Sequence, residues 1–104
     1  MLIIKHDHML PTGVDICLRV KEDGLMVRSR SEIFETLAIL GKAKKVLLGM
    51  EEEGHTAILH YEPPVAPTME IWYEDCKVLV RSTVEHDEAI KMVNEAIEMV
   101  KKVI

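Results

Sequence analysis

The sequence predicts an α+β fold: an antiparallel sheet of six to seven strands with two helices packed on one face. Two observations predict it. A turn, a short strand and a helix occur twice in the same order, around Val27-Arg28-Ser29 and Val80-Arg81-Ser82. Other stretches alternate apolar and polar residues with the period of two that a half-buried strand requires. We expect one domain over residues 1–104, whose halves, 1–41 and 42–104, are related by an internal βββα duplication.

Composition places the chain among folded globular proteins. It has 104 residues, of which 48% are hydrophobic and 30% charged, and its net charge of −5 disfavours non-specific polyanion binding by the whole surface. Two cysteines, Cys17 and Cys76, are too few for a disulfide scaffold, so we expect reduced thiols and a cytoplasmic protein. No apolar run approaches membrane-spanning length. The absence of glutamine and the abundance of Lys and Glu are typical of a heat-adapted, archaeal source.

The first half reads as three strands and a helix. The strands are residues 2–6, 14–20 and 25–28, with a Glu-Asp-Gly hairpin turn before the third. Ser29 with Glu32 three residues later predicts a capping box. Gly41 can adopt the left-handed backbone conformation that commonly ends a helix, so we expect the helix over residues 30–40.

The second half repeats this plan with one additional strand. We predict strands over residues 46–50, 56–62, 69–73 and 77–81, and a proline-rich loop at 63–67. Ser82 with Glu85 forms a second capping box. Apolar residues at helical spacing then predict a long amphipathic helix that reaches Ile104.

Strand alternation sorts the side chains onto two faces, since neighbours on a strand point to opposite sides. The set expected to face the helices is apolar: Val14, Ile16, Leu18, Val20, Leu25, Val27, Val46, Leu48, Ile58, Ile71, Val78 and Val80. The set expected on the opposite, open side mixes large apolar groups with cations: Cys17, Arg19, Met26, Arg28, Lys45, Leu47, Leu59, Tyr61, Trp72, Lys77, Leu79 and Arg81.

The open side is the predicted binding surface, because Trp, Tyr, Met and Arg are enriched at interfaces and monomers rarely expose so large an apolar patch. Its candidate binding residues are Arg19, Arg28, Lys45, Leu59, Tyr61, Trp72, Lys77, Leu79 and Arg81. If the halves are related by a pseudo-twofold axis, Arg28 and Arg81 lie symmetrically and could hold a carboxylate or phosphate. The alternative is that the sheet curls and buries part of this side on itself.

Three histidines form the candidate metal site. His6 and His8 point the same way in an extended chain, and His60 on a later strand could complete the set around a divalent cation. Otherwise we expect no cofactor. The P-loop, dinucleotide-binding, nucleophile-elbow and C-x-x-C motifs are all absent, and neither cysteine has a catalytic base fixed by spacing, so we assign no catalytic residues.

The hairpin, Ser82 cap and long C-terminal helix over residues 68–104 resemble the end of a TATA-box-binding-protein repeat. The resemblance implies an open sheet face that binds the DNA minor groove, with phenylalanines wedged between bases. This chain departs from that pattern, because Phe34 is its sole phenylalanine and falls in a predicted helix.

These observations favour a non-enzymatic binding or assembly module. We expect the open side to pack against a second copy as a homodimer or to hold a small anionic ligand, with no membrane partner. A small metal-dependent enzyme using His6, His8 and His60 is one alternative. Nucleic-acid binding by the open side is another, which the acidic net charge disfavours.

Overall fold

A computed structural model describes residues 3–6, 14–22, 24–49, 59–60, 68–74 and 77–104. In chain order its elements are β1 (Ile3–His6), β2 (Ile16–Lys21), β3 (Gly24–Ser29), α1 (Ile33–Leu47), β4 (Leu59–His60), β5 (Thr68–Glu74), β6 (Lys77–Ser82) and α2 (His86–Val103). A hairpin followed by a helix therefore occurs twice, as predicted. Neither α1 nor α2 is long and apolar enough to cross a membrane.

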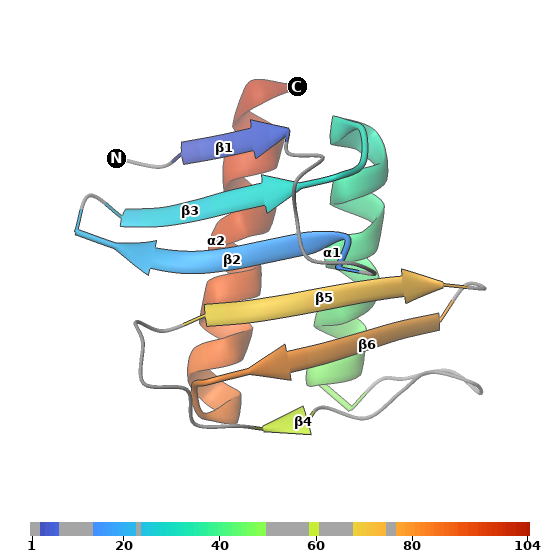
Figure 1. The fold of residues 1–104 in the computed structure, drawn as a ribbon, viewed down its shortest axis with the longest axis vertical. Coiled ribbons are helices and arrows are strands. Elements are labelled where there is room, and N and C mark those ends of the chain that lie inside the picture. The colour runs from blue at the N-terminus through green and yellow to red at the C-terminus, as the bar shows by residue number, and fades with distance from the viewer. Residues whose placement is uncertain (1–2, 7–13, 23, 50–58, 61–67, 75–76) are drawn as a thin grey trace.

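The strands form one sheet in the order β1-β3-β2-β5-β6-β4 (Figure 1). The four central strands are antiparallel to one another, which confirms the predicted antiparallel sheet for this part. The two edge strands differ from the prediction, because β1 pairs with β3 and β4 pairs with β6 in parallel. The reason is connectivity: each edge strand lies beside the second strand of the following hairpin, not beside the first.

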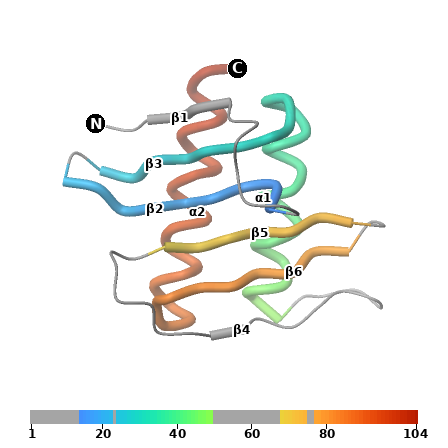
Figure 2. Tube along the Cα trace, in the orientation of Figure 1, coloured from blue at the N-terminus to red at the C-terminus, as the bar shows by residue number. Residues whose placement is uncertain are grey.

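Both helices lie side by side against the same face of the sheet (Figures 1 and 2). The core fills the space between the two layers and takes the alternate residues of the central strands that the sequence predicted for this side, namely Ile16, Leu18, Leu25, Val27, Ile71, Val78 and Val80, all at most 2% exposed. Val20, near the end of β2, lies on this side opposite Leu25 as predicted, but it is 39% exposed. The prediction for Val14 is wrong, because it lies outside this core. Ile58 is outside the described residues.

Helix α1 is longer than predicted and includes residues 46 and 47, which were predicted to begin a strand. Gly41 does not stop it, because the apolar stripe continues through the buried Ala43, Val46 and Leu47. The stop is Gly49, whose φ of 75° is the left-handed conformation that glycine favours. Lys45 and Leu47 are therefore wrongly assigned to the open side of the sheet: both lie on α1, Lys45 exposed and Leu47 in the core. Leu48, assigned to the helix side, is the exposed C-cap of α1.

The predicted capping boxes are also wrong in detail. The N-cap residues are Glu32 and Glu85, and neither side chain makes a capping hydrogen bond. Ser29 and Ser82 instead end their strands, and each accepts a hydrogen bond on its Oγ from the N–H two residues on, at 3.1 Å and 3.0 Å. The serines thus shape the turn into the helix, so α1 and α2 start three residues later than expected.

The segment from β2 to α1 corresponds to the segment from β5 to α2 at a constant difference in number, 53 for Ser29 and Ser82 (82 − 29). The first strands do not share this offset, because His6 of β1 and His60 of β4 pair with Ser29 and Ser82, a difference of 54 (60 − 6). Three hydrogen bonds from backbone N–H groups recur at the same offset. Arg30 and Thr83 donate to the carbonyls of Asp15 and Thr68, Thr36 and Ala89 to the carbonyls of Glu32 and Glu85, and Ser31 and Val84 to the Oγ atoms of Ser29 and Ser82. Each buried position of α1 (Thr36, Ile39, Leu40, Ala43, Val46, Leu47) also matches a buried position of α2 (Ala89, Met92, Val93, Ala96, Met99, Val100), where Ile97 is buried in addition. Cys17 of β2 pairs with Glu70 of β5, its own counterpart, so the local twofold axis passes between these two residues.

Candidate binding surface

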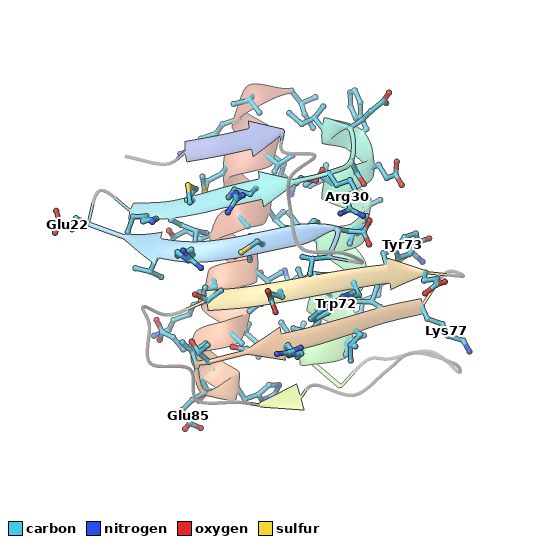
Figure 3. The ribbon with its side chains drawn as sticks, in the orientation of Figure 1. Glu22, Arg30, Trp72, Tyr73, Lys77 and Glu85 are labelled. Atoms are coloured by element: carbon cyan, nitrogen blue, oxygen red, sulfur yellow. The ribbon has the colours of Figure 1, made fainter. Side chains whose placement is uncertain are left out.

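The side of the sheet opposite the helices carries most of the predicted binding residues (Figure 3). On the four central strands this open face comprises Cys17, Arg19, Lys21, Met26, Arg28, Glu70, Trp72, Glu74, Lys77, Leu79 and Arg81. Its placement follows from alternation, because each of these residues neighbours one that is directed into the core on the same strand. Lys21, Glu70 and Glu74 were missing from the sequence-based set. Extending the alternation of the strand at 14–20 by one residue would have added Lys21.

The apolar residues of the open face are partly covered by one another. Cys17 is only 6% exposed and packs with Val14 and the half-buried Trp72 in a cluster separate from the main core. Val14 was expected under the helices and lies instead in this cluster. Met26 and Leu79 are also half-buried. The open face is therefore not a wide, fully exposed apolar patch.

The open face differs from the chain as a whole in the sign of its charge. The four central strands set five cations on it (Arg19, Lys21, Arg28, Lys77 and Arg81) against two acids (Glu70 and Glu74). The full chain, in contrast, has 13 Lys and Arg against 18 Asp and Glu. A local cationic surface therefore exists within an acidic protein, which favours anionic partners at this face.

The strand register places these charges relative to one another. Arg28, Cys17, Glu70 and Arg81 form one line across the four central strands. The guanidinium carbon of Arg81 lies 5.3 Å from the ring centroid of Trp72, close enough for a cation–π contact. Trp72 therefore packs on the Cys17 cluster and also holds the Arg81 side chain.

Two groups near the middle of β2 sit in an unusual electrostatic environment. The Nε of Arg19 is buried and has no hydrogen-bond partner within the described part of the chain. Burial raises the pKa of the Cys17 thiol, an effect that Arg19, Arg28 and Lys21 oppose and Glu70 reinforces. At neutral pH Cys17 is therefore a protonated, largely buried thiol and a poor nucleophile.

The structure does not bring the three predicted metal ligands together. His6 pairs with Ser29 on edge strand β1, and His60 pairs with Ser82 on edge strand β4. Four strands separate these edges, or roughly 24 Å at the usual strand spacing. His8 lies outside the described residues. Among the residues that the structure does describe, no group of three His, Cys, Asp or Glu side chains could hold a metal.

Of the remaining predicted binding residues, the structure describes Leu59 at the sheet edge. Leu59 is on β4, where the register sets it opposite Arg81, and Tyr61 falls outside the described ranges. His86, which the sequence left without a role, contacts the Leu47 carbonyl and so joins the start of α2 to the end of α1. No pattern within either segment indicated this contact, because the two residues are far apart in the chain.

No protein-family model, curated protein or solved structure matches this chain. The resemblance to a TATA-box-binding-protein repeat accordingly stays a prediction. Phe34 lies on α1 and is 66% exposed, so it is not on the open face.

Proposed function

We propose that this protein is a non-enzymatic binding module whose open face holds an anionic ligand. The observation that supports the proposal is the excess of cations over acids on that face, five against two on the central strands, in a chain whose net charge is negative. Arginine and lysine bind carboxylates and phosphates through charge-assisted hydrogen bonds, which are stronger than neutral ones.

The same charges argue against a homodimer built from two open faces. Packing the face on a second copy would bring two cationic surfaces together, and like charges at an interface cost several kcal/mol. The partial burial of Trp72, Met26 and Leu79 within one chain also weakens the need for a covering partner. Of the two occupants expected from the sequence, the anionic ligand is therefore the better supported.

The proposal is tested by titrating isotope-labelled protein with inorganic phosphate at low ionic strength and following amide chemical shifts. We expect the shifts to concentrate on the central strands and to leave the outer side of α2 unchanged. Sedimentation of the same sample tests the homodimer. An absence of shifts on the sheet, or shifts centred on the helices, would overturn the proposal.

We also propose that the two halves arose by duplication of a βββα unit. The support is the offset of 53 over two strands and a helix, which the buried positions of α1 and three hydrogen bonds from backbone N–H groups share. The first strands, β1 and β4, lie beside equivalent strands at an offset of 54. The boundary between the two units then lies after Gly49, the glycine that stops the first helix, and not after residue 41. Sequences of relatives that align with themselves at this offset, with more identities than this chain retains, would support the proposal.

A further inference from the structure

The two halves have kept the same core but carry different charges on the open face. At equivalent positions β2 has Cys17, Arg19 and Lys21, whereas β5 has Glu70, Trp72 and Glu74. Both acids that the four central strands place on the open face are therefore on β5, in the second half. Asp15, which precedes β2 in the first half, accepts a hydrogen bond from the Tyr73 N–H. The equivalent arginines Arg28 and Arg81 are retained in both.

In the second half each acid lies directly opposite a cation. Glu70 pairs in register with Arg81, and Glu74 pairs with Lys77. Directly opposite residues on an antiparallel pair are close enough for opposite charges to attract and compensate one another. The second half of the open face is therefore close to electrically balanced.

In the first half the cations of β2 have no acid directly opposite them. Arg19 lies opposite Met26 on one side and Thr68 on the other, and Lys21 lies opposite Gly24. Glu70 is a diagonal neighbour of Arg19, but it lies directly opposite Arg81. The Nε of Arg19 is covered by the protein, whereas the residue as a whole is only half-buried, which leaves part of its side chain accessible to a ligand.

The geometry of β2 and β3 suits one small oxyanion. Arg28 is two residues along β3 from the partner of Arg19, and such diagonal neighbours lie about 7–8 Å apart. Long arginine side chains span that distance easily, so both guanidiniums can reach the same group. Lys21 lies two residues beyond Arg19 on β2, on the side away from Arg28, and adds positive charge next to Arg19. An extended polyanion would need a continuous track of cations, which the compensated second half does not provide.

We infer that Arg19, Arg28 and Lys21 form a subsite for a single oxyanion group, the phosphate or carboxylate of a small ligand. This inference rests on the proposed function and places the ligand on one half of the open face. Arg81 and Trp72 then form a neighbouring wall and are not the main anion ligands.

The test compares Arg19→Gln with Lys77→Gln, which removes one positive charge from the same face where Glu74 is opposite. Each variant, and the unchanged protein, is titrated with inorganic phosphate, with succinate as a carboxylate, and with a single-stranded oligonucleotide. Amide chemical shifts report both affinity and position. Far-UV circular dichroism checks that the variants are folded.

We expect Arg19→Gln to weaken binding of the preferred small anion at least about tenfold and Lys77→Gln less than about twofold. The comparison of phosphate with succinate identifies the group that the subsite prefers. Equal losses in the two variants would overturn the subsite but leave an anion-binding face. If the oligonucleotide binds far more tightly than phosphate, with a steep salt dependence, the single-oxyanion subsite is also overturned, and an anion-binding face is left. If no anion binds the unchanged protein, the proposed function fails as well.

Discussion

The halves β1–α1 and β4–α2 show which features of a repeated unit must be kept and which can change. Buried positions correspond across the offset of 53, for example Leu18 with Ile71 and Ala43 with Ala96. Open-face positions differ even in charge, as in Arg19 and Trp72. The core must fill a closed volume at high density, whereas a residue on the open face needs only solvent or a ligand. The differences in charge between the halves are therefore concentrated on the open face.

A second difference concerns the turn into each helix. Ser29 has an additional buried partner, since its Oγ lies 2.6 Å from the hydroxyl of Thr36. The counterpart of Thr36 is Ala89, which has no hydroxyl, so within the described ranges the Ser82 Oγ bonds to the N–H and carbonyl of Val84 in its own turn. The same backbone turn is thus supported by a hydroxyl pair in one half and by a single hydroxyl in the other.

The largest effect is expected from core truncation, which tests whether the halves form one cooperative unit. Leu18→Ala and Ile71→Ala remove equivalent side chains that are both 0% exposed. Each should lower the free energy of unfolding by about 2–5 kcal/mol, because lost burial and a residual cavity add together. Urea denaturation followed by circular dichroism measures the change, and Leu48→Ala at the exposed end of α1 should cost less than about 1 kcal/mol.

If the halves depend on each other, both core variants unfold in a single transition. Two separate transitions, with one half unaffected by the substitution in the other, would show that the two halves unfold independently.

An intermediate effect is expected at the two serines. Ser29→Ala should destabilise the protein by about 1–3 kcal/mol, since it removes the acceptor of the Ser31 N–H and one partner of the buried Thr36 hydroxyl. Ser82→Ala loses only the bond within its own turn and should cost about 0.5–1.5 kcal/mol. Thermal denaturation of the two variants compares them. Equal costs would mean that the hydroxyl pair adds nothing to stability.

The smallest effect is a pH dependence at the twofold axis, where Cys17 faces Glu70. Burial raises the pKa of the Cys17 thiol above 9.0, so the folded state favours the protonated form. Stability from this group is therefore full below pH 9 and declines as pH rises through the folded pKa, because the unfolded thiol ionises first.

This decline is measured by urea denaturation at pH 8 and pH 10 in a Cys76→Ser background, with Cys17→Ala in the same background as the reference. The reference should lose less stability over this interval. Glu70→Gln should lower the pKa of Cys17 and Arg19→Gln should raise it, because each removes a charge that acts on the thiol. Identical pH profiles with and without the Cys17 thiol would contradict the raised pKa of Cys17 in the folded state.

Local patterns were enough to predict much of this molecule. Alternation predicted the faces of the four central strands, and the repeated Val-Arg-Ser segment predicted two hairpin–helix units with Arg28 and Arg81 at equivalent places. These features depend on neighbours in the sequence, which periodicity reports directly. The end of α1 was mispredicted, because Gly41 is a helix stop only where packing does not continue the stripe, and here Ala43, Val46 and Leu47 continue it.

Residue patterns are sufficient to indicate the α+β class, the amphipathic elements and the side of the sheet to which most strand residues belong. The folded structure was needed to show that β1 and β4 lie at opposite edges, which separates His6 from His60. It was also needed to show that the acids of β5 lie opposite cations of β6, whereas Arg19 has no acid directly opposite. Strand order and register are set by contacts between distant segments. No local pattern of residues encodes them, and they determine which charges remain available to a ligand.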